Sequence, residues 1–184
     1  MRNRLLPLFV ISLLMMSFTF TDWEVFKSYD GKFQVLSPGE MTEKVNLITT
    51  DIGEMKYVTY LHQPESKDAD NLVYMVSYCD YPENSVHSDS TELVEEFFET
   101  TVSTAVESVH GELQYATEIN LGAYPGRLWR INYNEGNALI KTKSFLVGRR
   151  YYSIQAITLK DRSMNVSLDK FLDSFSLILV EEKM

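Results

Sequence analysis

The fold is decided by residues 112–159, which read ELQYATEINLGAYPGRLWRINYNEGNALIKTKSFLVGRRYYSIQAITL. Turn signals divide this stretch into runs rich in the β-branched and aromatic side chains that strands favour. Glu135-Gly136 separates residues 128–133 from residues 138–147, and Gly148-Arg149 allows a tight turn into residues 151–159. Strands joined by such short turns are antiparallel, so residues 112–159 predict a four-stranded antiparallel meander.

The residues before this stretch predict further strands. Asp30-Gly31 lies between two apolar runs and is a strong short-range hairpin signal. Residues 50–53 likewise separate two runs in which apolar and polar residues alternate. The strands predicted before the first helix lie at residues 25–26, at 33–36, in a run that ends near residue 49, at 55–61 and at 72–81.

Two segments have the period of an α-helix. The first is predicted to begin near Asp89, because Asp89 and Glu92 have capping-box spacing, and to end at Gly111. The second is predicted to begin after Ser167 as its N-cap. Each segment carries one apolar stripe, at Leu93, Val94, Phe97, Phe98, Val102, Ala105, Val106 and Val109 in the first and at Leu168, Phe171, Leu172 and Phe175 in the second.

The order of these elements predicts the fold class. Each apolar stripe must cover a sheet, so strands, helix, strands and helix indicate an α+β fold with a mainly antiparallel β-sheet flanked by helices. No repeat, low-complexity tract or linker interrupts the chain after residue 22. Residues 22–184 are therefore predicted to form a single domain.

Short motifs are distributed over nearly all of the chain after residue 22. They are Trp23-x-x-Phe26-x-Ser28-x-Asp30-Gly31-x-Phe33, Tyr74-x-Val76-Ser77-Tyr78-x-Asp80-Tyr81-Pro82, Leu121-Gly122-Ala123-Tyr124-Pro125-Gly126-Arg127, Phe145-Leu146-Val147-Gly148-x-Arg150-Tyr151-Tyr152 and Lys170-Phe171-Leu172-Asp173-Ser174-Phe175. This set resembles small exported bacterial proteins of uncharacterised function, whose fold is similar to the PsbP-like α/β/α sandwich. The resemblance implies that fold but no particular chemistry, because proteins of one fold bind different partners.

The N-terminus has the layout of an export segment. Arg2 and Arg4 precede residues 5–20, a run without charge that is shorter than the ~20 residues that span a bilayer comfortably. Residues 1–21 are therefore predicted to be a secretory signal peptide or, if uncleaved, an N-terminal membrane anchor. No cysteine lies in or just after the run, so the lipoprotein route is excluded. The expected location is periplasmic or secreted, with a membrane contact only through residues 5–20.

Composition narrows the range of partners. The chain of 184 residues has a formal net charge of −9, and loss of Arg2 and Arg4 leaves 15 basic against 26 acidic residues, a charge of −11. Such a surface repels phosphate backbones, so nucleic acid is not an expected partner. Cys79 is the single cysteine, so an intramolecular disulfide is excluded.

The sequence predicts no catalytic residue, metal or cofactor. His62, His87 and His110 lack the i,i+2 or i,i+4 spacing of metal ligands. Cys79 could be a thiol nucleophile, but the neighbouring Asp80 would raise its pKa. Cys79 shares a strand face with Ser77 and is predicted to be a small buried thiol instead. No serine lies in a G-x-S-x-G elbow, and no Gly-rich loop precedes a helix to hold phosphate.

The candidate binding surface lies on the meander. Alternation places Arg127 with Trp129, Lys141 with Lys143, and Arg149 with Tyr151 on one face of their respective strands. If the three faces coincide, these residues form a cationic and aromatic patch on an acidic protein. The alternative is that Trp129 and Tyr151 are half-buried sheet residues along which neighbouring side chains extend.

The first hypothesis for function is therefore an exported, non-enzymatic binding or accessory module for a protein or a small ligand. It predicts that alanine at both Arg127 and Trp129 weakens binding and leaves the thermal midpoint largely intact. One alternative is a hydrolytic enzyme, which requires a deep pocket with convergent, pKa-shifted polar groups. The other is a structural protein of the cell envelope.

Overall fold

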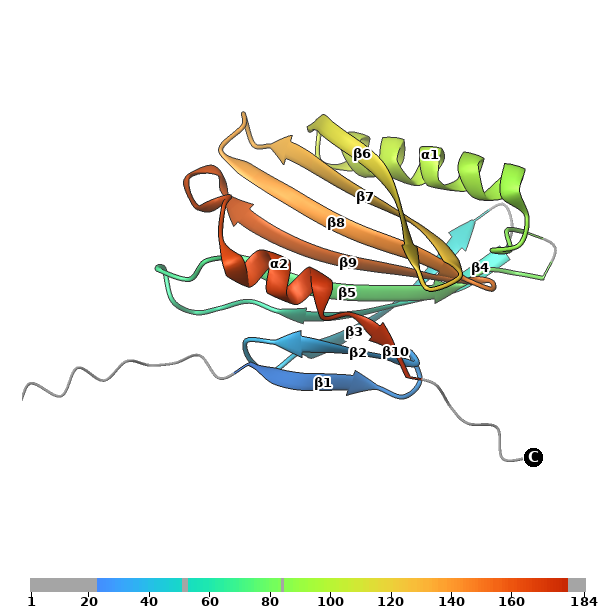
Figure 1. Ribbon diagram of the computed structural model, residues 1–184, viewed down its shortest axis with the longest axis horizontal. Coiled ribbons are helices and arrows are strands. Elements are labelled where there is room, and N and C mark those ends of the chain that lie inside the picture. The colour runs from blue at the N-terminus through green and yellow to red at the C-terminus, as the bar shows by residue number, and fades with distance from the viewer. Residues whose placement is uncertain (1–22, 51–52, 84, 179–184) are drawn as a thin grey trace, which may run out of the picture.

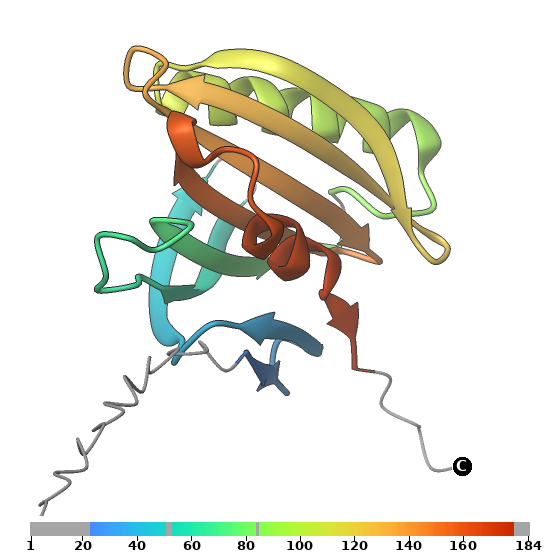
Figure 2. The same ribbon diagram turned by 60° about the vertical axis from the view of Figure 1, so that its left-hand side comes forward.

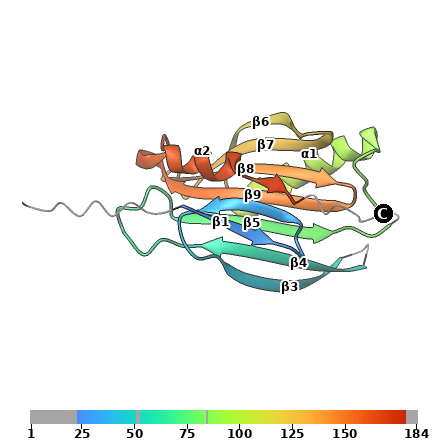
Figure 3. The same cartoon turned by 60° about the horizontal axis from the view of Figure 1, so that its bottom comes forward.

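The computed structural model describes residues 23–50, 53–83 and 85–178, so the predicted export segment 1–21 lies outside the described residues. Its centre is a seven-stranded sheet of order β3-β4-β5-β9-β8-β7-β6, in which every neighbouring pair is antiparallel (Figure 3). The strands are β3 (Thr42–Thr50), β4 (Gly53–His62), β5 (Val73–Asp80), β6 (Glu112–Leu121), β7 (Tyr124–Tyr133), β8 (Ala138–Val147) and β9 (Arg150–Leu159).

The predicted meander is confirmed. Strands β6 to β9 follow one another both in sequence and in the sheet, at the positions that the turn signals indicated. Gly136 and Gly148 have φ of 81° and 60°, a left-handed conformation that glycine adopts without a steric penalty. The local turn signals are thus sufficient to predict the positions and order of these four strands.

The hairpin at Asp30-Gly31 is also present, but it belongs to a second, small sheet. This sheet has the order β1-β2-β10 and consists of β1 (Glu24–Ser28), β2 (Phe33–Ser37) and β10 (Ser176–Leu177). Phe33 and Val35 of β2 are fully buried against the central sheet. Gly31 makes this packing possible, because a Cβ there would lie only 2.7 Å from the Phe33 ring and from the Ser28 hydroxyl.

The two helices cover opposite faces of the central sheet (Figures 1 and 2). Helix α1 (Thr91–Ser108) lies against β6 and β7, and α2 (Val166–Asp173) lies on the other face together with the small sheet. A short 3-10 turn, η1 (Lys160–Arg162), precedes α2. The predicted α+β class, a mainly antiparallel sheet flanked by helices, is confirmed. Within the described ranges, neither helix is long and apolar enough to cross a membrane.

The ends of α1 differ from the prediction. Its N-cap is Ser90, which makes no side-chain capping hydrogen bond, so the capping box expected at Asp89 and Glu92 is wrong. At the other end His110, not Gly111, takes the left-handed conformation, with φ of 48°. Gly111 is required for close packing instead, because a Cβ there would lie 2.4 Å from the Ile131 side chain.

The start of α2 also differs by two residues. The Asn165 side chain caps the helix by accepting a hydrogen bond from the Leu168 backbone N–H at 2.7 Å, so the prediction of Ser167 as N-cap is wrong. Ser167 donates instead to the Asp70 carboxylate at 2.5 Å. Either residue type can cap a helix, and tertiary contacts from Asp70 and Asn71 decide between them.

Candidate ligand-binding cleft

The apolar stripe of α1 divides between two environments. Val94, Phe98 and Val102 are buried against the sheet, as the helical period predicted. Leu93 and Phe97 lie on the flank of the helix, where Leu93 remains 48% exposed. Because one residue of an α-helix is rotated by about 100° from the next, this flank faces sideways along the sheet. Part of the stripe that was expected to be core therefore lines a cleft.

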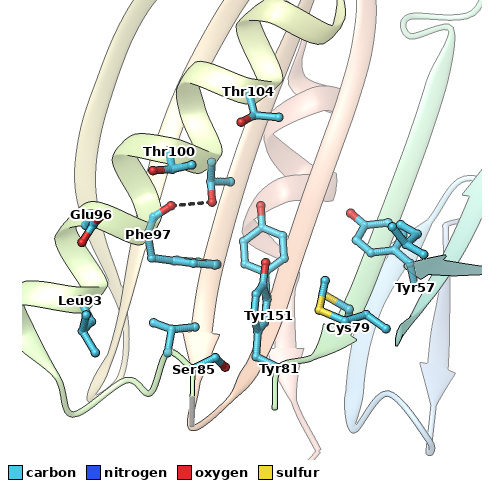
Figure 4. A pocket seen from close by; sticks show the side chains of 14 residues that line it. Tyr57, Cys79, Tyr81, Ser85, Leu93, Glu96, Phe97, Thr100, Thr104 and Tyr151 are labelled. Carbon is cyan, nitrogen blue, oxygen red and sulfur yellow. Dashed lines mark hydrogen bonds between the residues drawn. The ribbon is translucent and has the colours of Figure 1, made fainter. Parts of the chain in front are cut away.

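The cleft lies between α1 and the side of the sheet that carries β3, β4 and β5, and has a volume of about 520 Å³. Figure 4 shows Phe97 and Thr104 of α1 on one side and Tyr57 and Cys79 on the other, with Tyr81 and Tyr151 between them. Its lining comes from the β3–β4 hairpin (Ile48, Met55, Tyr57), β5 and the segment after it (Cys79, Tyr81, Ser85, Val86), α1 (Leu93, Glu96, Phe97, Thr100, Thr101, Thr104) and β9 (Tyr151).

Sheet register brings the floor of the cleft together. Tyr57 of β4 pairs with Cys79 of β5, and Cys79 pairs with Tyr151 of β9, so the three side chains form one row on the α1 face. The wall is made of aromatic rings in edge contact. The Phe97 ring lies 5.4 Å from the Tyr151 ring and 5.3 Å from the Tyr81 ring, between ring centroids. These contacts hold an aromatic surface in place without a ligand.

The floor is a strongly desolvated environment. Burial raises the pKa of the Cys79 thiol to about 12, and the Asp80 carboxylate contributes to the increase. Burial likewise raises the pKa of Tyr81 to about 12 and raises the pKa of Tyr151. All these groups are neutral at physiological pH, so negative charge is disfavoured in this part of the cleft.

A row of hydroxyl groups lies beside the floor. Ser144, Ser153, Ser77 and Thr59 follow one another across β8, β9, β5 and β4, and all four are buried. The hydroxyls of Thr59 and Ser77 lie 3.0 Å apart. Such hydrogen bonds satisfy polar groups that would otherwise be costly to bury. The row can hold the hydroxyl group of a neighbouring tyrosine ring in a fixed position. Hydrogen bonds from Ser153 and Ser144 lower the pKa of Tyr151 and oppose part of the larger increase that burial causes.

The structure does not form the predicted cationic and aromatic patch. Tyr133 pairs with Ala138 across the turn between β7 and β8, so odd-numbered residues of β7 share a face with even-numbered residues of β8. Trp129 therefore pairs with Thr142, while Lys141 and Lys143 project from the opposite face. The prediction that the three strand faces coincide is wrong for this reason.

Arg127, Trp129 and Tyr151 lie on the α1 face, but they do not make an open surface. Arg127 donates to Glu95 of α1 at 2.7 Å and lies over the Phe98 ring. Trp129 is 1% exposed, packs with Val102, and its Nε1 finds no hydrogen-bond acceptor among the described residues. Alanine at Trp129 would remove a core side chain, so the burial of Trp129 argues against a thermal midpoint that stays largely intact. Tyr151 is the one predicted residue that lines the cleft.

The remaining predicted site residues have structural partners. Lys141 donates to Asp169 of α2 at 2.7 Å, and Lys143 pairs with Asp173 one helical turn further along. These pairs attach α2 to the sheet. Arg149 lies in the turn between β8 and β9, where its guanidinium is 3.6 Å from the Glu83 carboxylate.

Sequence reasoning missed most of the cleft. The one available signal was the flank of α1, where Thr100, Thr101 and Thr104 follow Leu93 and Phe97. Uncharged hydroxyls at these positions, in a helix whose other polar face carries glutamates, indicate a surface that is neither core nor fully solvated. The hairpin and β5 could be assigned to the same cleft only from sheet order.

No group of three or more His, Cys, Asp or Glu side chains in the described ranges is arranged to hold a metal ion. No protein-family model matches the chain, and no curated protein matches its sequence significantly.

Proposed function

We propose that this protein is an exported binding module that holds a small, largely apolar ligand in the cleft between α1 and the β3–β4 hairpin. The observation that carries the proposal is the cleft itself. Its volume of about 520 Å³ falls within the roughly 300–1,000 Å³ of small-molecule sites. Its walls are mostly apolar and aromatic, with a few hydroxyl groups at the side, which is the usual composition of such sites.

Export and family resemblance belong to the same proposal. Arg2, Arg4 and the uncharged run 5–20 support delivery across a membrane. The placement of α1 and α2 on opposite faces of one antiparallel sheet supports a PsbP-like α/β/α sandwich. A fold of this kind positions the cleft but does not by itself specify the ligand.

A hydrolytic role is less well supported by the geometry. The nucleophilic side chain closest to such a role is Cys79, at the floor of the cleft. A reactive cysteine needs a lowered pKa, usually from nearby positive charge. Burial and Asp80 raise the pKa of Cys79 to about 12. The floor therefore favours holding a ligand over attacking it.

The proposal is tested by filling the cleft. Thr104 and its neighbour Ser103 are both exposed, but only Thr104 is part of the cleft lining. We expect wild-type protein to bind 2-naphthylmethanol, a neutral apolar probe, in a calorimetric titration. Thr104→Trp should abolish this binding because the indole occupies the space, and Ser103→Trp should retain it.

Equal binding by the two variants would show that the probe binds elsewhere. Absence of binding to wild-type protein by a panel of apolar probes would contradict the proposal and favour the structural role in the envelope. Circular dichroism of both variants checks that each is folded.

A further inference from the structure

We infer that the ligand carries one positive charge beside its apolar body, and that the Glu96 carboxylate at the cleft receives it. This inference rests on the proposed function, because it names the class of ligand for the same site. The cleft would then select small amphipathic amines over neutral or anionic molecules of the same shape.

Glu96 is the charged residue among the described residues that line the cleft. It lies on α1 between Leu93 and Thr100, and its side chain is exposed. No ion pair in the described part of the chain involves Glu96, whereas its neighbour Glu95 is bound to Arg127. Glu96 is thus available to a cation that enters the cleft.

The surrounding charges oppose an anionic ligand. Helix α1 has five glutamates and no lysine or arginine. Three arginines near the cleft lie beside a carboxylate, Arg127 beside Glu95, Arg149 beside Glu83 and Arg150 beside Asp80. Lys44 lies on β3 opposite Thr59 and is not among the lining residues. Among the described residues that line the cleft there is therefore no guanidinium or ammonium group to bind a carboxylate or phosphate.

The interior favours the same selection. The rings of Tyr57, Tyr81, Tyr151 and Phe97 provide π faces, which attract cations and repel anions. The desolvation that keeps the Cys79 thiol and the Tyr81 phenol neutral would also oppose a buried carboxylate. A ligand with its ammonium group near the exposed Glu96 carboxylate and its apolar body among the rings is attracted by the π faces and leaves no charge buried at the floor.

The test compares three ligands that share a naphthalene body: 2-naphthylmethylamine, which is an ammonium at pH 7, the neutral 2-naphthylmethanol and the anionic 2-naphthoate. We expect the ammonium to bind about two- to five-fold more tightly than the alcohol, the range for an exposed ion pair. The carboxylate should bind more weakly than the alcohol. Added salt should reduce the differences, since it screens exposed charges.

Matched variants assign the preference to one side chain. Glu96→Gln should remove the preference for the ammonium over the alcohol. Glu99→Gln is the control, because Glu99 is an exposed residue of the same helix that does not line the cleft. It should keep the preference.

The outcomes separate this inference from the proposed function. Binding of the alcohol without a preference for the ammonium, or a preference that survives Glu96→Gln, would overturn the inference and leave the cleft as a neutral apolar site. Failure of all three compounds to bind would overturn the proposed function itself.

Discussion

Adjacent phenylalanines of α1 allow the cleft and the core to be tested separately. Phe98 is 1% exposed and packs against the sheet, so Phe98→Ala should reduce the free energy of unfolding by about 3–5 kcal/mol. Phe97 is half-buried on the cleft wall, where truncation widens an open space and leaves no closed cavity. Phe97→Ala should therefore cost only about 0.8–1.5 kcal/mol, half of the free energy of complete burial.

The two variants should rank in the opposite order for ligand affinity, because Phe97→Ala loses affinity and Phe98→Ala keeps most of it. Phe97→Ala removes the ring that contacts Tyr81 and Tyr151, and its loss should weaken 2-naphthylmethanol binding about ten-fold, equivalent to ~1.4 kcal/mol. Phe98→Ala, measured where it is still folded, should bind nearly as well as wild type. Urea unfolding followed by circular dichroism gives the stabilities, and calorimetry gives the affinities. Equal stability losses for the two variants would refute the assignment of Phe97 to an open cleft wall.

Two further predictions concern buried groups on the α1 face. Trp129→Ala should reduce the free energy of unfolding by about 3–5 kcal/mol because it empties a buried site. Trp129→Phe should stay within about 1.5 kcal/mol of wild type, because the volume it loses is offset by removal of a buried N–H without an acceptor among the described residues. Equal losses in urea unfolding would show that the indole N–H is satisfied. Native Cys79 should react with iodoacetamide at pH 8 about a thousand-fold more slowly than in the unfolded chain, because its pKa rises from 9.0 to about 12. Folding favours the neutral thiol over the thiolate. The contribution of Cys79 to the free energy of unfolding is therefore complete below pH 9, and it is lost as the pH rises toward 12. A urea midpoint that stays constant over that range would contradict the desolvated floor.

The sequence predicted the elements well because their signals are local. Alternating apolar residues and glycine-containing turns specified β6 to β9, and the helical period specified α1 and α2 to within a few residues. The separation of β1 and β2 into a second sheet could not be predicted in this way. It depends on Phe33 packing against Tyr78 and Tyr152, which are distant in the chain.

The site was harder to predict because it depends on register. The turn at 134–137 determines whether Lys141 shares a face with Trp129 or with α2, and a change of one residue in pairing would exchange the two faces. The cleft depends further on sheet order, because Tyr57, Cys79 and Tyr151 meet only when β4, β5 and β9 are neighbours. Neither property follows from composition or periodicity.

The most direct test of the cleft as a ligand site is to map backbone amide chemical shifts of the wild-type protein during titration with 2-naphthylmethanol. The largest changes should occur at Tyr57, Cys79, Phe97 and Tyr151, while Lys141 and Lys143 on the opposite face should be unaffected. Shift changes centred on the α2 face, or none at saturating probe, would contradict the account.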